Sequence, residues 1–377
     1  MMRVLTGAQV FDGSLLHPDR AVLLPDSGPP RIVTMAGIPD AATRIPLAGG
    51  TVMPGFVDLQ VNGGGGVMLG EAPHDAVLDR MVSAHRGLGT NGLLPTLITD
   101  APRNVAGTIE VVAQAVRDGM PGVLGLHLEG PHLDPVRKGA HDPGLIRPMA
   151  QDDLDLLLQA NDRLPNLMVT LAPAAVATEQ IETLARAGVI VSLGHSDCDY
   201  DTAMRAFDAG ARCATHLFNA MSPLASRAPG LVGAVLDAPA VSAGLIADGI
   251  HVHPATIRAA LAAKRSPGEL FLVTDAMAFA GSDARSMTLN DREITRKDGR
   301  LTLPDGTLAG ADLDMARAIG VMIDRVGDDP ARAMARATSI PAGVLRDAMG
   351  MGGWPTDPAM LIHVDAAYGT VTRADRL

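Results

Sequence analysis

The feature that most constrains the fold is a series of eight short apolar runs that alternate with helical patterns along the chain. Each run has the length and composition of a buried β-strand, and segments between them place apolar residues at helical spacing. Several helical segments end at glycine, as helix C-termini often do. The runs cover residues 55–61, 92–99, 122–129, 166–173, 188–195, 211–218, 240–247 and 269–276.

Eight strand–helix units fit an α/β protein with a (β/α)8 TIM-like barrel. A doubly wound open sheet remains an alternative, because periodicity indicates the alternation but not the closure of the sheet. The 377 residues are enough for one barrel and a smaller companion domain.

The two ends of the chain have a different pattern. Residues 1–52 contain short alternating strands separated by Gly, Pro and Asp, and residues 355–377 repeat that pattern. Because strands need partners to bury their apolar faces, we expect both ends to assemble into one small, discontinuous β-sandwich domain. Residues 53–354 then form the catalytic barrel.

Composition excludes several classes of function. The net charge is −11 and the basic residues are scattered, which argues against nucleic-acid and anionic-membrane partners. The two cysteines, Cys198 and Cys213, form no disulfide framework, and neither a signal peptide nor a membrane-spanning apolar stretch is evident. We therefore expect a cytoplasmic enzyme.

Four ionisable residues stand at the ends of the predicted strands. Glu129 ends the third run, His195 the fifth, His216 the sixth and Asp275 the eighth. The C-terminal strand ends of a barrel line one mouth, so these side chains should converge. A single histidine after an apolar strand is usually structural, but buried carboxylates at such positions need a cation or protons as partners.

This group has the chemistry of a metal-dependent hydrolase. One Glu and two His form a three-ligand catalytic zinc shell with an open position for water. Asp275 is then free to act as a base.

The chain resembles the N-acetylglucosamine-6-phosphate deacetylases of the amidohydrolase superfamily over nearly its whole length. The matching motifs, in order, are PGFVDLQVNGGGG, LHLEGPHL, GHS, THLFNAM, DGIHVHP, TDAM and LAGADLDM. The resemblance implies that Glu129, His195 and His216 bind the metal and that Asp275 is the catalytic acid/base. It implies hydrolysis of the acetamide of N-acetyl-D-glucosamine 6-phosphate to D-glucosamine 6-phosphate and acetate.

The number of metal ions per site is predicted from the residues at the end of the first strand. Many amidohydrolases carry His-x-His there to hold a second metal, whereas this chain has Gln60 and Asn62. Amides are poor ligands for zinc, so we expect one divalent ion per site, zinc first, with iron, cobalt or manganese as alternatives.

The resemblance also implies a set of substrate-binding residues. His141 is placed to polarise the acetamide carbonyl and so is counted as catalytic too, and Arg227 resembles an arginine that reaches the phosphate from the neighbouring subunit of a homodimer. The segment 308–310 is expected to be a loop that closes over the substrate. The full set is Gln60, Asn62, Ala140, His141, Asn219, Ala220, Arg227, Asp248, Gly249, Ile250, His251, Leu308, Ala309 and Gly310.

The remaining histidines carry no expected role in substrate binding. His17, His74 and His85 fall in segments with the pattern of surface helices or loops, whereas His127 either supports Glu129, two residues along the same strand face, or is structural.

Three alternatives to this reaction stay open. The same deacetylation could act on N-acetylgalactosamine 6-phosphate, which differs in the orientation of one hydroxyl. The motifs and Arg227 disfavour a cyclic-amide or nucleobase hydrolase. A non-catalytic sugar-phosphate-binding barrel is the third, since fold does not determine function.

Overall fold

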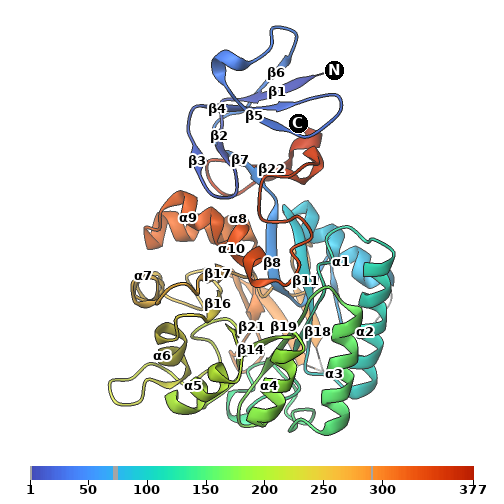
Figure 1. The fold of residues 1–377 in the computed structure, drawn as a ribbon, viewed down its shortest axis with the longest axis vertical. Coiled ribbons are helices and arrows are strands. Elements are labelled where there is room, and N and C mark those ends of the chain that lie inside the picture. Colours follow the sequence, from blue (N-terminus) through green and yellow to red (C-terminus); the bar gives the residue numbers. More distant parts are fainter. Residues whose placement is uncertain (1, 71–74, 290–291) are drawn as a thin grey trace.

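The computed structural model describes residues 2–70, 75–289 and 292–377. Figure 1 shows a large αβ body and, at one end of it, a small β unit that contains both chain termini. His74 and the three residues before it, 71–73, lie outside the described residues.

The large body is a barrel of parallel strands, as the eight apolar runs predict. Neighbouring strands pair in sequence order, and the first and last meet through a bridge between Val61 and Ala276. The strands are β8 (Phe56–Val61), β11 (Thr90–Ile98), β12 (Leu126–Glu129), β13 (Leu167–Leu171), β14 (Ile190–Leu193), β15 (Cys213–Ala214), β16 (Ser242–Leu245) and β17 (Leu270–Leu272).

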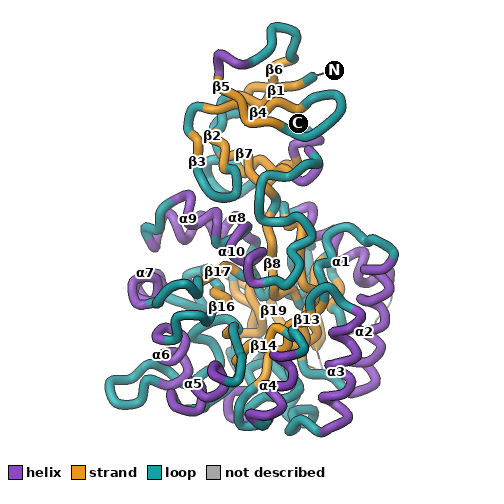
Figure 2. Tube along the Cα trace, viewed as in Figure 1, coloured by secondary structure: helices purple, strands orange, loops and turns teal. Residues whose placement is uncertain are grey.

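Helices surround these strands (Figure 2). They are α1 (Asp75–Gly87), α2 (Pro102–Arg117), α3 (Gln151–Arg163), α4 (Thr178–Arg186), α5 (Tyr200–Asp208), α6 (Gly230–Asp237), α7 (Pro254–Ala263) and α8 (Met315–Val321). A π-helical turn (Met322–Val326), α9 (Pro330–Ala335) and α10 (Ser339–Val344) follow α8. The expected (β/α)8 barrel is confirmed.

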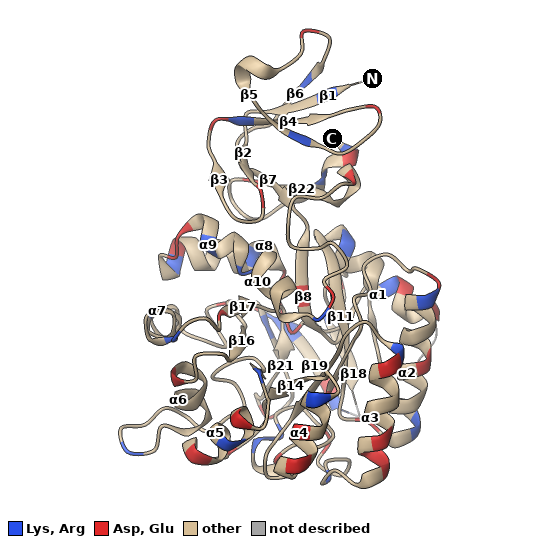
Figure 3. Cartoon of the chain, viewed as in Figure 1, with Lys and Arg blue, Asp and Glu red and all other residues tan. Residues whose placement is uncertain are grey.

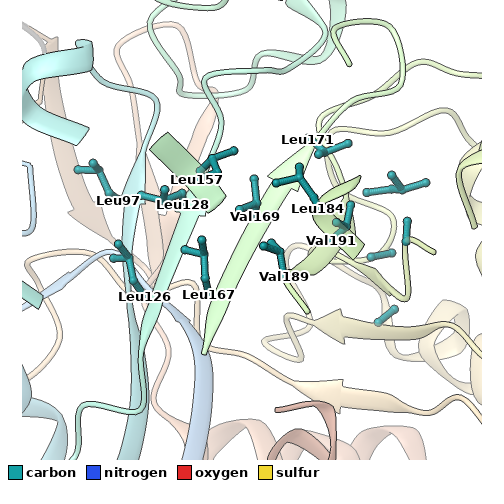
Figure 4. Packing of buried hydrophobic residues seen from close by; sticks show 14 of the residues in the cluster. Leu97, Leu126, Leu128, Leu157, Leu167, Val169, Leu171, Leu184, Val189 and Val191 are labelled. Atoms are coloured by element: carbon teal, nitrogen blue, oxygen red, sulfur yellow. The ribbon is translucent and has the colours of Figure 1, made fainter. Parts of the chain in front are cut away.

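Along the barrel strands, side chains alternate between the core under the helices and the interior of the barrel, where the site lies. Leu126 and Leu128 of β12 pack outward against the helices, together with Leu167 and Val169 of β13 (Figure 4). Successive side chains of a strand point to opposite faces, so the β12 residues that alternate with these leucines, His127 and Glu129, point into the barrel. Glu129 is one of them, and its position follows from the core pattern.

The small unit is a two-sheet β-sandwich assembled from both ends of the chain, and its core includes Leu5, Val22, Val52 and Leu361. One sheet has the order β5-β4-β1-β6 and the other β23-β22-β7-β2-β3. The strands are β1 (Arg3–Thr6), β2 (Gln9–Phe11), β3 (Leu16–His17), β4 (Arg20–Leu24), β5 (Arg31–Thr34), β6 (Thr43–Pro46), β7 (Thr51–Pro54), β22 (Leu361–Val364) and β23 (Val371–Arg373). The domain limits at residues 52 and 355 remain predictions; β7 extends across the first of them.

A four-stranded antiparallel sheet is inserted in the chain between β17 and α8. Its strands are β18 (Ser286–Leu289), β19 (Arg292–Lys297), β20 (Arg300–Thr302) and β21 (Leu308–Ala311). Residues 308–310 therefore lie in a strand and not in the expected loop. A short hairpin of β9 (Gly63–Gly64) and β10 (Val67–Met68) follows β8. Within the described residues, 3-10 turns cover 35–37, 135–137, 358–360 and 374–376.

Charged residues of both signs are interspersed over the helices in the view of Figure 3. Among the residues that the structure describes, no helix has the length and apolar character needed to cross a bilayer.

Candidate active site

Three potential metal ligands meet at the C-terminal mouth of the barrel. Glu129 ends β12, while His195 and His216 lie two residues beyond the ends of β14 and β15. The Oε1 atom of Glu129 lies 3.2 Å from His195 Nε2 and 3.1 Å from His216 Nε2, and the two nitrogens are 3.0 Å apart. All three side chains are buried.

The hydrogen bond on the far side of His195 indicates what this triangle holds. His195 Nδ1 donates to the carbonyl oxygen of Arg137 at 2.8 Å, which leaves a lone pair on Nε2 of the neutral ring. That lone pair faces a carboxylate oxygen and a second imidazole nitrogen. Tetrahedral zinc, with bonds of about 2.0–2.2 Å, spaces its ligands about 3.3 Å apart, so the triangle fits such a cation.

His141 lies beside the triangle and joins an alternative grouping. Ligand atoms of Glu129, His141 and His195 all fall within 4.8 Å of one another. His141 Nδ1, however, accepts the backbone N–H of Thr99 at 3.3 Å and lies 2.8 Å from the Thr99 hydroxyl. We favour His216 as the third ligand, because its Nε2 lies in the tighter triangle.

Asp275 follows β17 and lies against the side chains of the first strand. Its Oδ1 accepts hydrogen bonds from Asn62 Nδ2 at 2.7 Å and from Gln60 Nε2 at 3.2 Å. Gln60 Nε2 also donates to Glu129 Oε1 at 3.1 Å. Burial, reinforced by the negative charge of Glu129, raises the pKa of Asp275 to about 6.

Glu129 and His141 in the mouth also have shifted pKa values. Burial alone would raise the pKa of Glu129, but its contacts with the imidazoles of His195 and His216 outweigh burial and hold that pKa well below its usual range. Burial, with the adjacent His195, lowers the pKa of His141 to about 3. Glu129 is therefore a carboxylate and His141 a neutral imidazole near neutral pH.

The backbone at these positions is strained. His195, His216 and Asp275 have φ angles of 46°, 31° and 49°, in the left-handed region that residues other than glycine rarely adopt. Such strain concentrates at functional sites, where the surrounding structure fixes it.

A cavity of about 370 Å³ opens above these residues, a size suited to a small-molecule ligand. Of the expected substrate residues, it brings together the segment at 140–141, the THLFNAM positions 219 and 220, and the strand β21. His251 also lines it, with Nδ1 2.6 Å from Asp248 Oδ2. The expected residues in its wall are Asn62, Ala140, His141, Asn219, Ala220, His251, Leu308, Ala309 and Gly310.

The other expected residues lie outside this wall. Gln60 contacts the two carboxylates from below, and Asp248 orients His251 while accepting backbone N–H groups of Ile250 and His251. Gly249 belongs to that same turn. Arg227 is exposed in the 223–228 segment and does not line the cavity of its own chain.

The interpretation of His85 as a surface residue was wrong. His85 is 1% exposed, and its Nε2 lies 2.8 Å from the carbonyl oxygen of Gly63, beside the site. His85 falls on the apolar face of α1 with Leu78, Met81 and Val82, which was the available signal.

Other polar side chains lie below the mouth; of these, sequence reasoning named His127 but missed Asp58, Thr170 and Thr215. His127 Nε2 lies 2.7 Å from Thr170 Oγ1, which in turn lies 2.6 Å from Thr215 Oγ1, so His127 belongs to a buried hydroxyl network. Asp58, on β8, is entirely buried. Its place two residues before Gln60 on the same strand face was a signal for both the interior and the site.

Comparison with known proteins places the chain in a family. Residues 51–346 match the amidohydrolase family. An N-acetylgalactosamine-6-phosphate deacetylase of Shewanella sp. is 41% identical over 78% of this chain and 74% of its own length. An N-acetylglucosamine-6-phosphate deacetylase of Haemophilus influenzae is 34% identical over 82% and 81%.

Solved structures agree over the whole fold. The crystal structure of N-acetylglucosamine-6-phosphate deacetylase from Pasteurella multocida is 31% identical, covers 98% of this chain and 96% of that one, and has a TM-score of 0.88. A mutant of the Mycobacterium smegmatis enzyme in complex with N-acetyl-D-glucosamine-6-phosphate is 31% identical over 99% and 98%, with a TM-score of 0.87. The chain therefore belongs to the amidohydrolase family and, within it, to the group of N-acetylated amino-sugar 6-phosphate deacetylases.

Proposed function

We propose that the chain hydrolyses the acetamide of N-acetyl-D-glucosamine 6-phosphate to D-glucosamine 6-phosphate and acetate. The observation that carries the proposal is the convergence of a three-atom ligand triangle with the buried carboxylate of Asp275 in one cavity. The names of the similar proteins supply the class of substrate.

The proposed metal ligands are Glu129, His195 and His216. A divalent cation there would supply Lewis acidity, which polarises a carbonyl and brings the pKa of water toward neutrality. Zinc is the first choice, because two imidazoles and one carboxylate form a common catalytic zinc shell, while iron, cobalt and manganese accept the same ligands.

One cation per site is supported by the amides at positions 60 and 62. Both direct N–H groups at carboxylate oxygens: Gln60 at Glu129 and Asp275, and Asn62 at Asp275. An N–H donor repels a cation, so these hydrogen bonds oppose a second ion on that side of the triangle.

Asp275 is the proposed acid/base. Its carboxylate takes a proton from the attacking water and later gives it to the nitrogen of the departing amine, so that one group serves both halves of the reaction. A pKa near 6 suits both transfers, because the group is ionised at neutral pH yet holds a proton readily.

Two histidines are proposed to hold the substrate. His141 accepts the Thr99 N–H at Nδ1, so its neutral ring carries a proton on Nε2, which can donate to the oxygen of the acetamide as charge develops there. His251 is oriented by Asp248 and lines the cavity, where it can bind the sugar or its phosphate.

N-acetylgalactosamine 6-phosphate is the second candidate substrate. The Shewanella relative, at 41% identity, carries that substrate in its name. The two sugars differ at one hydroxyl, which lies away from the acetamide, so the proposed chemistry is common to both.

The test is an acetate-release assay with both epimeric sugar phosphates, each with and without a chelator. We expect release with the gluco epimer that stops on chelation and returns on addition of Zn²⁺. A higher kcat/KM for the galacto epimer would make N-acetylgalactosamine 6-phosphate the first candidate substrate and N-acetyl-D-glucosamine 6-phosphate the second. Tight binding of either phosphate without acetate release would instead support the non-catalytic alternative.

We also propose a homodimer in which Arg227 reaches the neighbouring site. Within its own chain Arg227 is exposed and outside the cavity wall, which fits a role across an interface. A guanidinium presents a planar fork of donors suited to a phosphate.

A further inference from the structure

Asp58 is a buried carboxylate that the proposed reaction does not use. It lies within β8 and is 0% exposed. β8 is the first barrel strand and β17 the last. In the part of the chain that the structure describes, backbone pairing between them is found only beyond Asp58, at the bridge between Val61 and Ala276 and its adjoining hydrogen bonds. Asp58 lies at the seam where backbone pairing between these strands is missing.

The carboxylate of Asp58 replaces that pairing. The backbone N–H of Thr274 lies 3.3 Å from each carboxylate oxygen, and the Thr274 hydroxyl donates to Oδ2. The backbone N–H of Gln60 donates to Oδ1 at 3.2 Å. A buried carboxylate is stabilised by several N–H and O–H donors, so Asp58 joins the two strands with its side chain.

The two partners of Asp58 both connect directly to Asp275. Thr274 directly precedes Asp275 in the chain. The Gln60 carbonyl accepts the backbone N–H of Asp275 at 3.1 Å, and the Gln60 side chain donates to Asp275 Oδ1 at 3.2 Å. Asp275 has a φ of 49°, a strained conformation that persists only where neighbouring contacts fix it.

We propose that Asp58 is a positioning residue that fixes the carboxylate of Asp275, acting through Thr274 and Gln60. The proposal rests on the proposed function, in which Asp275 transfers the proton. Loosening this contact should therefore reduce kcat more than it changes KM. A misplacement of about 1 Å at a reacting group costs on the order of a hundredfold in rate.

Thr274→Val is the decisive variant, because valine keeps the shape of threonine and removes the hydroxyl donor. Thr274→Ser keeps that donor. Thr108→Val is the matched control, since Thr108 is a buried threonine on α2 whose Oγ1 has no hydrogen-bond partner among the described residues. Asp58→Asn, which replaces one acceptor oxygen with an NH₂ donor, tests the same contact from the other side.

We expect kcat of metal-loaded Thr274→Val to fall roughly tenfold to a hundredfold, with KM changed less than about threefold. Thr274→Ser should keep kcat within about threefold of wild type, and Thr108→Val should match wild type. A crystal structure of Thr274→Val should show the Asp275 carboxylate displaced from its 2.7 Å contact with Asn62.

Three results would overturn the proposal: a kcat of Thr274→Val within about twofold of wild type, a loss in Thr274→Ser as large as in Thr274→Val, or a KM that rises as much as kcat falls. If Thr274→Val does not fold, Asp58→Asn is judged by the same kinetic limits. A wild-type protein that releases no acetate refutes the proposed function. In that case, an undisplaced Asp275 in the crystal structure would refute the positioning role as well.

Discussion

Asp275→Asn isolates proton transfer from the rest of the site. Asparagine has the same shape as aspartate, and its oxygen can still accept from Asn62 and Gln60, which now donate to Asp275 Oδ1 at 2.7 and 3.2 Å. The three proposed metal ligands are untouched. The substitution thus removes the proton acceptor while it leaves the metal triangle and the cavity wall in place.

The expected loss follows from that single role. General acid/base catalysis contributes on the order of a hundredfold or more, so kcat should fall at least that far. At about 1.36 kcal/mol for each tenfold, the barrier rises by about 2.7 kcal/mol or more. Acetate release gives kcat, metal analysis gives the ion content, and calorimetry with the sugar phosphate gives Kd, which should change little.

Asp199→Asn is the matched control. Asp199 caps the N-terminus of α5 by accepting the Thr202 N–H at 2.8 Å, and asparagine caps a helix about as well as aspartate. This variant should keep wild-type turnover. If Asp275→Asn retains more than about a tenth of wild-type kcat with its metal bound, Asp275 is not the acid/base.

Three further predictions concern pH, metal and assembly. Asp275 must be ionised to accept a proton, and its pKa is about 6, so kcat/KM should rise with pH through a midpoint at or below about 6. A bound cation lowers the pKa of Asp275, and with it this midpoint, further. A kcat/KM that rises from pH 6 to pH 5 would contradict this prediction. Glu129→Gln should lose bound zinc, and metal analysis of the wild type should find one activity-linked ion per chain, not two. Mixed dimers of Arg227→Ala and Asp275→Asn chains should recover part of the activity, since each contains one intact composite site; exchange without recovery would place Arg227 outside the neighbouring site.

The sequence predicts the barrel well because its signals are local. Alternation of apolar strands with helical segments is dictated by backbone geometry and burial, and the eight runs correspond one by one to strands. Closure of the sheet is different. It depends on contacts between β8 and β17, which are more than 200 residues apart and meet through the Asp58 side chain and the bridge between Val61 and Ala276, so periodicity could not settle it.

The site also has parts that local sequence signals predict and parts that they do not. Glu129, His195, His216 and Asp275 could be found because each ends an apolar run, and barrel topology brings strand ends together. No comparable rule predicts where the sheet β18–β21 lies relative to the site. Its strands are short and exposed on one face, and only the closed barrel mouth below gives residues such as Leu308 a cavity to line.

Charge balance links the number of metal ions to the protonation states in the site. The ionised carboxylates of Glu129 and Asp275 carry two negative charges in the buried mouth. Burial raises the pKa of Asp58, below them, to about 7, so this carboxyl adds less negative charge near neutral pH. The depressed pKa of His141 keeps that ring neutral. One divalent cation at the triangle neutralises both carboxylates, whereas a second would leave an excess positive charge that burial disfavours. The amides of Gln60 and Asn62 suit this balance, because they give hydrogen bonds to the carboxylates without adding charge.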